Sequence, residues 1–231
     1  MSSIVQEMDD NVRDAKSLAT QVASELESVA KRTGAFLEQG RSDLEQGLIL
    51  DTETEASIEE KMKALEARIN QSLEQHEKEL MDKFDRLIDA MERLNERTIG
   101  QMLGESIKSE WNKLKDFVKD AKDSVKNFFI SVKEKVSECV HTMKDRADAY
   151  IAFKVKQPIK ETVESIRDAV DNCKEAVKTK AVECGRGIVN GMEKATRGFA
   201  DKLASKADSF ADKRDKLDEK LADKTDVEKA D

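Results

Sequence analysis

Apolar residues follow this chain in narrow stripes with helical spacing. Between Met8 and Phe36 they recur in alternating steps of four and three residues, the heptad spacing of helices that pack along a shared seam. From Ile58 to Thr98 the pattern contains extra steps of four, which insert stutters into the heptads. These stretches predict two long amphipathic helices, separated by a break at the acidic segment 51–55.

A different period governs the second half of the chain. From Leu114 to Ile151 the apolar residues form an eleven-residue repeat, with about 3.67 residues per turn, which keeps a stripe nearly straight. Pro158 lacks a backbone N–H, so it ends this helix and suits the first turn of the next, where the same period resumes. The residues expected to form the helix–helix seams are Leu114, Val118, Val125, Phe129, Val132, Val136, Val140, Ile166, Val170, Val177, Ile188, Phe199, Leu203 and Phe210.

These patterns divide the chain into four helical segments and a tail. Three glycines between 34 and 47 cost roughly 1 kcal/mol each and weaken the end of the first helix. Gly100 and Gly104 bracket the turn between the two halves, with Ser106 as the expected N-cap of the next helix. The predicted segments are 1–50 (heptad helix), 51–104 (second coiled-coil helix), 105–157 and 158–222 (two eleven-residue-repeat helices), and 223–231 (charged, frayed tail).

The predicted fold class is all-α, with long amphipathic helices in antiparallel coiled-coil or hairpin packing and mixed heptad and eleven-residue periods. A narrow stripe does not stabilise an isolated helix, so each stripe must be covered by the same chain, another chain or a lipid surface. Segments 105–157 and 158–222 have equal periods, so their stripes stay in register and should fold back on each other at Pro158. Segments 1–50 and 51–104 would pair separately or with another chain.

Composition supports helices and narrows the functional classes. Of 231 residues, 39% are charged, 4% are aromatic and one is proline, which leaves too few strand and turn formers for a β or α/β fold. The net charge of −8 divides into about −10 for residues 1–100 and about +2 for the remainder, so no basic nucleic-acid-binding face is expected. An odd number of cysteines, no secretory signal and no membrane span favour a reduced, cytoplasmic setting. Whether the chain continues beyond Asp231 stays open.

Residues that could carry chemistry are few and poorly spaced. Cys139, Cys173, Cys184 and His141 are acceptable zinc ligands by type, but they form no CxxC pair and lie on different predicted helices. His76 falls on an apolar stripe, where packing or a role in helix register is expected rather than catalysis. No phosphate-binding loop or nucleophile–base arrangement is present in the sequence. We therefore expect no enzyme activity, cofactor, metal or small-molecule substrate.

Lysines flank the apolar stripes. Around Phe129, Lys122, Lys126 and Lys133 lie within about 60° on a helical projection, whereas the carboxylates lie on the opposite side. Such lysines suit the flank of a coiled coil and suit a membrane-surface helix equally well. A separate basic cluster around Pro158 is a candidate contact for an anionic surface, and it consists of Lys154, Lys156 and Lys160.

Two stretches resemble known helical-repeat families in composition and period. They are AKDSVKNFFISVKEKV (121–136) and GFADKLASKADSFADK (198–213), which are similar to late-embryogenesis-abundant proteins and to exchangeable apolipoproteins or synuclein-like proteins. The resemblance covers about Leu114–Leu221 and rests on period and lysine flanks, without a specific motif. It implies either a stress-protective chain that folds conditionally or a lipid-surface helix.

The sequence thus predicts a non-enzymatic helical scaffold or interaction protein that acts through coiled-coil seams, by binding a protein partner or a second copy. Two alternatives stay open: a peripheral membrane or lipid-surface-binding protein, and a stress-protective conditionally folded protein. Neither the partner nor the oligomeric state follows from the sequence.

Overall fold

The protein is built from helices throughout the part of the chain that the structure describes. The computed structural model describes residues 2–154 and 158–227, with all side chains in these ranges except those of Ser2, Phe210 and residues 214–227. The helices are α1 (Ser2–Ile49), α2 (Glu55–Arg93), α3 (Glu96–Leu103), α4 (Glu105–Ala152) and α5 (Ile159–Val227). No strand occurs in the described ranges, and the predicted all-α class is confirmed.

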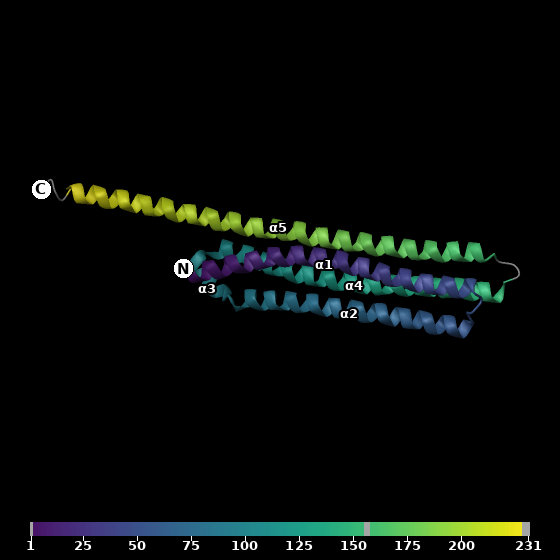
Figure 1. Cartoon of the computed structure of the whole chain (residues 1–231). Helices are drawn as coiled ribbons and strands as arrows, with labels where there is room; N and C mark the ends of the chain where they lie inside the picture. Colours follow the sequence, from purple (N-terminus) through teal and green to yellow (C-terminus); the bar gives the residue numbers. More distant parts are fainter. Residues whose placement is uncertain (1, 155–157, 228–231) are drawn as a thin grey trace.

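The four long helices form one antiparallel bundle (Figure 1). Successive helices run in alternating directions, α1 packs on α2 and α5, and α4 packs on the same two neighbours. The expected return of α5 along α4 is confirmed, with Pro158 directly before α5. The expectation that α1 and α2 pair separately is wrong, because α1 makes its most extensive contact with α5. Each stripe is covered by two neighbouring helices, which a separate hairpin would not provide.

The predicted stripes form the core of this bundle. Every predicted seam residue from Leu114 to Phe199 is buried, and Leu203 is partly buried. Phe210, the last in the set, lies outside the described side chains. The largest buried side chains are Trp111, Phe84, Phe129 and Phe199. The apolar spacing therefore identified the face of each helix that is removed from water, and this burial stabilises the bundle.

The first turn lies where the acidic segment predicts a break. Helix α1 ends at Ile49, and Asp51 adopts a left-handed conformation with φ of 57°, which aspartate tolerates better than most residues. Thr54 then caps α2, because its hydroxyl accepts from the Ser57 N–H and the Ser57 hydroxyl accepts from the Thr54 N–H. Contrary to the expected weakening, α1 continues through its glycines, and Gly40 faces the Leu65 side chain of α2.

The corner between the two halves differs from the prediction. Helix α2 ends at Arg93, and Asn95 caps the short helix α3 by accepting from the Arg97 and Thr98 N–H groups. Gly104 alone joins α3 to α4, with φ of 97°, a conformation that favours glycine. Ser106 is not the N-cap, since α4 begins at Glu105.

One glycine allows an unusually close approach of two helices. A Cβ built on Gly185 of α5 would lie 3.0 Å from the Cα of Ala23 on α1. That atom belongs to the backbone and has little freedom to move away. The absence of a side chain at Gly185 therefore lets α5 and α1 pack closely at this level.

Burial of the α4 stripe gives a stability prediction. Val132 is fully buried, so Val132→Asp places a carboxylate in the core and should reduce the free energy of unfolding by about 3 kcal/mol or more, as measured by urea denaturation. The matched control is Ile130→Asp on the same helix, where the side chain is 45% exposed and the expected change is within about 0.5 kcal/mol. Equal losses in the two variants would contradict the assigned core face.

Candidate interaction surfaces

Lysine and arginine ion pairs that join two different helices all have the same polarity in the described residues. In each such pair the cation comes from α4 or α5, and the carboxylate comes from α1, α2 or α3. Lys154, just after α4, pairs in the same direction with Asp51. The sequence signal for this arrangement was the contrast in net charge between the halves. The acidic half and the near-neutral half are thus electrostatically complementary along the bundle.

The contact between α2 and α4 shows this most clearly. Because the two helices are antiparallel, early lysines of α4 meet late acids of α2: Lys119 pairs with Glu92 at 2.6 Å, and Lys133 pairs with Glu77 at 3.0 Å. The hydrogen bond from Lys119 lowers the pKa of Glu92. Lys133 is one of the lysines that flank the predicted apolar stripe. In the bundle it forms an ion pair with the neighbouring helix.

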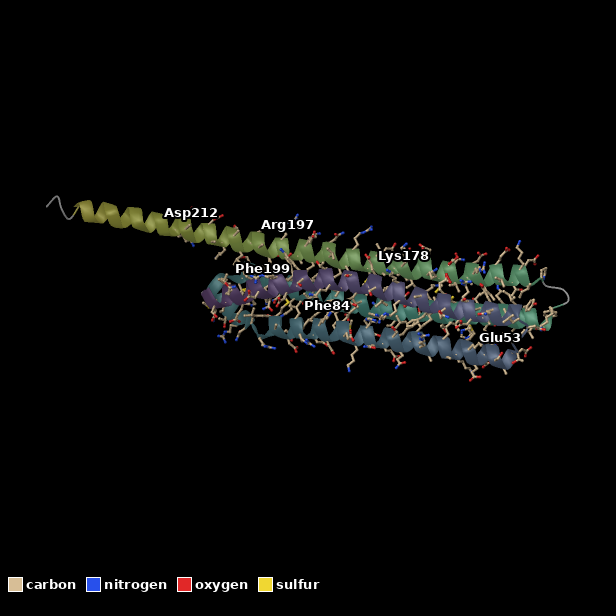
Figure 2. The ribbon with its side chains drawn as sticks, viewed as in Figure 1. Glu53, Phe84, Lys178, Arg197, Phe199 and Asp212 are labelled. Atoms are coloured by element: carbon tan, nitrogen blue, oxygen red, sulfur yellow. The ribbon has the colours of Figure 1, made fainter. Side chains whose placement is uncertain are left out.

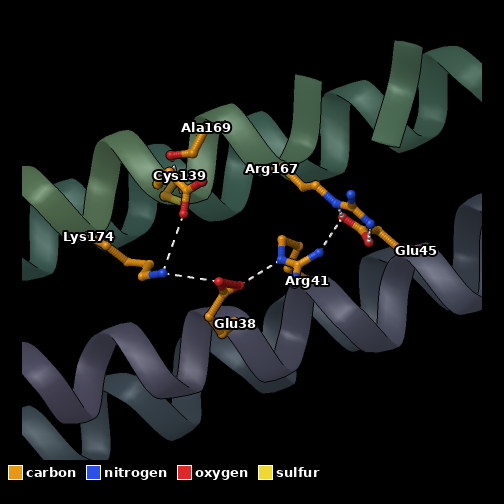
Figure 3. A network of polar contacts seen from close by, with 8 residues as sticks. Glu38, Arg41, Glu45, Cys139, Arg167, Ala169 and Lys174 are labelled. Atoms are coloured by element: carbon orange, nitrogen blue, oxygen red, sulfur yellow. Dashed lines mark hydrogen bonds and ion pairs between the residues drawn. The ribbon is translucent and has the colours of Figure 1, made fainter. Parts of the chain in front are cut away.

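A chain of alternating charges joins α1 to α5 (Figure 3). Lys174 of α5 contacts Glu38 at 3.0 Å, Glu38 contacts Arg41 at 2.6 Å, and Arg41 contacts Glu45 at 2.6 Å. Arg167 of α5 completes the chain with two hydrogen bonds to Glu45, whose side chain is only 7% exposed. The hydrogen bond from Arg41 lowers the pKa of Glu38, and the one to Glu45 raises the pKa of Arg167. Paired arginines thus compensate the buried Glu45 carboxylate.

The candidate anionic-surface residues lie at the end of the bundle where α1 and α4 finish. Lys154 forms an ion pair with Asp51, Lys160 is 84% exposed and lies 3.9 Å from Glu164, and Lys156 is outside the described residues. Pairing with carboxylates reduces the positive charge that this corner presents. The sequence reasoning missed that exposed Ile49 and Leu50 lie at the same end as exposed Phe153, because only the folded turns bring these segments together.

The cysteines are distributed along the contact between α4 and α5. Cys139 and Cys173 are both buried, and each thiol donates to a backbone carbonyl of the facing helix: Cys139 to Ala169 at 3.8 Å and Cys173 to Lys135 at 3.5 Å. The neighbouring Cys173 thiol together with burial raises the pKa of Cys139. Cys184 contacts the Ser124 carbonyl at 3.8 Å, elsewhere along α4. His141 is exposed and its Nδ1 lies 2.8 Å from the Ser137 carbonyl. Within the described residues no group of histidines, cysteines and carboxylates is arranged to hold a metal ion.

A groove lies between α1 and α5. It has a volume of about 750 Å³ and is lined by Ser24, Gly34 and Glu38 on one side and by Lys174 and Lys178 on the other. Two lysines in it are ion-paired, since Lys174 contacts Glu38 and Lys178 contacts Glu175. We therefore interpret the groove as the gap between two helices whose facing side chains include several small ones.

The most conspicuous surface is the part of α5 that extends past the bundle (Figures 1 and 2). Phe199 is the last fully buried residue of α5 among the described side chains, and its ring centroid lies 5.6 Å from that of Trp111. Beyond it Leu203 and Lys206 are partly buried, and Asp212 lies on the projection, past the end of α1 and α4. The sequence-predicted seam thus leaves the bundle between Phe199 and Phe210.

The comparisons with known proteins assign neither a family nor a function to this chain. The sequence matches no family model, and no curated protein matches it. Among the described residues, none of the helices combines the length and apolar character needed to cross a bilayer.

The charge chain between α1 and α5 predicts a pH-dependent contribution to stability. Glu38→Gln should lower the free energy of unfolding at pH 7 by about 0.5–1 kcal/mol, a small value because the Glu38 side chain is 37% exposed. The folded-state pKa of Glu38 lies below its ordinary value of 4.5, so this contribution is present above pH 4.5 and is lost as the pH falls through the lower folded-state value. Urea denaturation should therefore show the two proteins converging as the pH is lowered.

Glu27→Gln on the same helix is the control, because Glu27 is exposed. Its free energy of unfolding should stay within about 0.5 kcal/mol of the parent at each pH. A Glu38→Gln deficit that persists in acid would contradict an electrostatic origin.

Proposed function

We propose that this protein is a non-enzymatic helical scaffold, in which the four-helix bundle holds the C-terminal part of α5 out as an interaction helix. The observation that carries the proposal is the length of α5, which continues past the ends of α1 and α4. A helix that projects without a covering neighbour gains little stability from its own sequence, so a partner that covers it is the physical reason for its length.

The remaining surfaces support this choice over the alternatives. The stripes of α1, α2 and α4 are covered inside the bundle, so they are not free to bind partners while the bundle is folded. Their mutual burial argues for a chain that is folded on its own, and this weakens the conditionally folded alternative. The pairing of Lys154 with Asp51 weakens the membrane alternative at the basic corner.

A truncated chain tests whether the projection serves binding rather than folding. A protein that ends at Lys206 keeps every fully buried side chain among those that the structure describes, so its free energy of unfolding should stay within about 1 kcal/mol of the full chain. As a matched comparison, Phe199→Ala removes a buried ring that contacts Trp111 and should cost about 3–5 kcal/mol. Both values come from urea denaturation.

The same truncation tests the function directly. Proteins recovered from the native cell with the full chain should be lost when the bait ends at Lys206, while the amount of folded bait stays the same. Phe199→Ala, if still folded, should retain them. Recovery of the same proteins by the truncated bait would place the interaction on the bundle and contradict the proposal.

A further inference from the structure

The projecting part of α5 carries a short sequence repeat. The tetrapeptide Phe-Ala-Asp-Lys occurs at 199–202 and 210–213, and Leu-Ala-Asp-Lys occurs at 221–224. Eleven residues at about 100° each return a helical position to within about 20° of its starting direction. Phe199, Phe210 and Leu221 therefore fall on one face of α5. In the first repeat that face is buried in the bundle, and the next two repeats continue it beyond the bundle's end.

Charges on the projection are separated around this face. On a helical projection, five of the six basic positions between 206 and 224 lie within about 80° of the Phe210 position, and they are Lys206, Lys213, Arg214, Lys220 and Lys224. The sixth, Lys216, lies about 120° away. Most acidic positions lie at least about 140° away, and they are Asp208, Asp212, Asp215, Glu219, Asp223 and Asp226. Asp218, at about 80°, is the exception. The face therefore consists of a thin apolar line with predominantly basic flanks.

The bundle shows what covers such a face. Along the buried part of α5, the basic flank contacts the acidic helix α1, through Lys174 with Glu38 and Arg167 with Glu45, each at 3.0 Å. The close contact of Gly185 with Ala23 sets the antiparallel register of the two backbones, and continuing it brings Ser2, where α1 begins, level with residue 206 of α5. Beyond that level the same kind of face runs on, and α1 has no further described residues to cover it.

We propose that the projecting part of α5, residues 207–227, binds an acidic amphipathic helix of a partner protein, in the way that α1 covers the preceding part of α5. This inference rests on the proposed function and names the class of partner. Apolar residues of the partner would cover the Phe210, Leu217 and Leu221 positions, and its carboxylates would meet the basic flanks.

Two other occupants fit the face less well. In a pair of α5 projections from two copies, basic flanks would face basic flanks, and like charges across a helix seam destabilise it. A membrane-surface helix needs a broad apolar face, whereas here the apolar line is narrow and Arg214 lies about 40° from it. The narrow line and its flanks match the seam by which this protein packs its own helices.

Two synthetic peptides test the proposal against the full chain. Both are helices of roughly 28 residues with the same leucine stripe, long enough to cover the projection, and they differ only in having glutamate or lysine at the flanking positions. In fluorescence anisotropy, the glutamate peptide should bind at least about tenfold more tightly than the lysine peptide, and its binding should weaken with added salt.

Variants of the projection locate the binding site. The triple change Lys213→Glu, Lys220→Glu and Lys224→Glu should reverse the preference, so that the lysine peptide binds more tightly. Phe210→Asp with Leu217→Asp should remove binding of both peptides. The matched control is Lys63→Glu, Lys113→Glu and Lys178→Glu, which changes the net charge equally at exposed positions on the bundle and should leave the preference unchanged.

Each contrary outcome overturns the proposal. Equal binding of the two peptides, or binding that the projection variants leave intact, excludes an acidic helix at this face. Sedimentation that shows a dimer dissolved by Phe210→Asp would assign the face to a second copy. Binding to phosphatidylserine-containing vesicles in place of the glutamate peptide would assign it to a membrane. In all these cases a stable bundle that ends at Lys206 still leaves the scaffold proposal standing, whereas an unstable one removes it.

Discussion

Burial of narrow apolar stripes between four antiparallel helices is the constraint on which the rest of this structure depends. A stripe one or two residues wide needs cover, and within the bundle each long helix obtains that cover from two neighbours. Trp111, Phe129 and Phe199 fill the interior of this arrangement. The close contact of Gly185 with Ala23 and the single-residue corner at Gly104 follow from bringing straight helices together along such stripes.

Charge complementarity supports two of the contacts between long helices, α2 with α4 and α1 with α5. The acidic first half supplies the carboxylates and the second half supplies the cations, as in Lys119 with Glu92 and Arg167 with Glu45. Exposed pairs of this kind contribute little energy individually. Their consistent direction, however, disfavours pairings of α1 with α2 alone and favours α5 beside α1, where the buried Glu45 carboxylate is compensated. The projecting end of α5 carries basic positions like those of the preceding part, but no described residue of the acidic helix α1 lies beside it.

Much of the fold could be predicted from periodicity, and some of it could not. The helical segments, the break after Ile49, the return at Pro158 and the buried positions from Leu114 to Phe199 were all readable, because a helix of fixed period shows its apolar face in its spacing. The continuity of α1 through its glycines was not, since packing against α2 outweighs intrinsic propensity. Gly104 lies at the predicted turn, but the capping role of Asn95 was missed because the corner holds a short extra helix.

The candidate site divides in the same way. The sequence by itself determined that the seam continues through Phe199, Leu203 and Phe210, and that basic residues flank it, because both follow from residue spacing on one helix. Only the tertiary structure decided where that seam stops being covered, since this depends on the antiparallel register of α5 against α1 and on the point at which α1 begins. The spacing of residues along one helix depends only on that helix. Which neighbour covers an apolar stripe depends on how all the helices pack together.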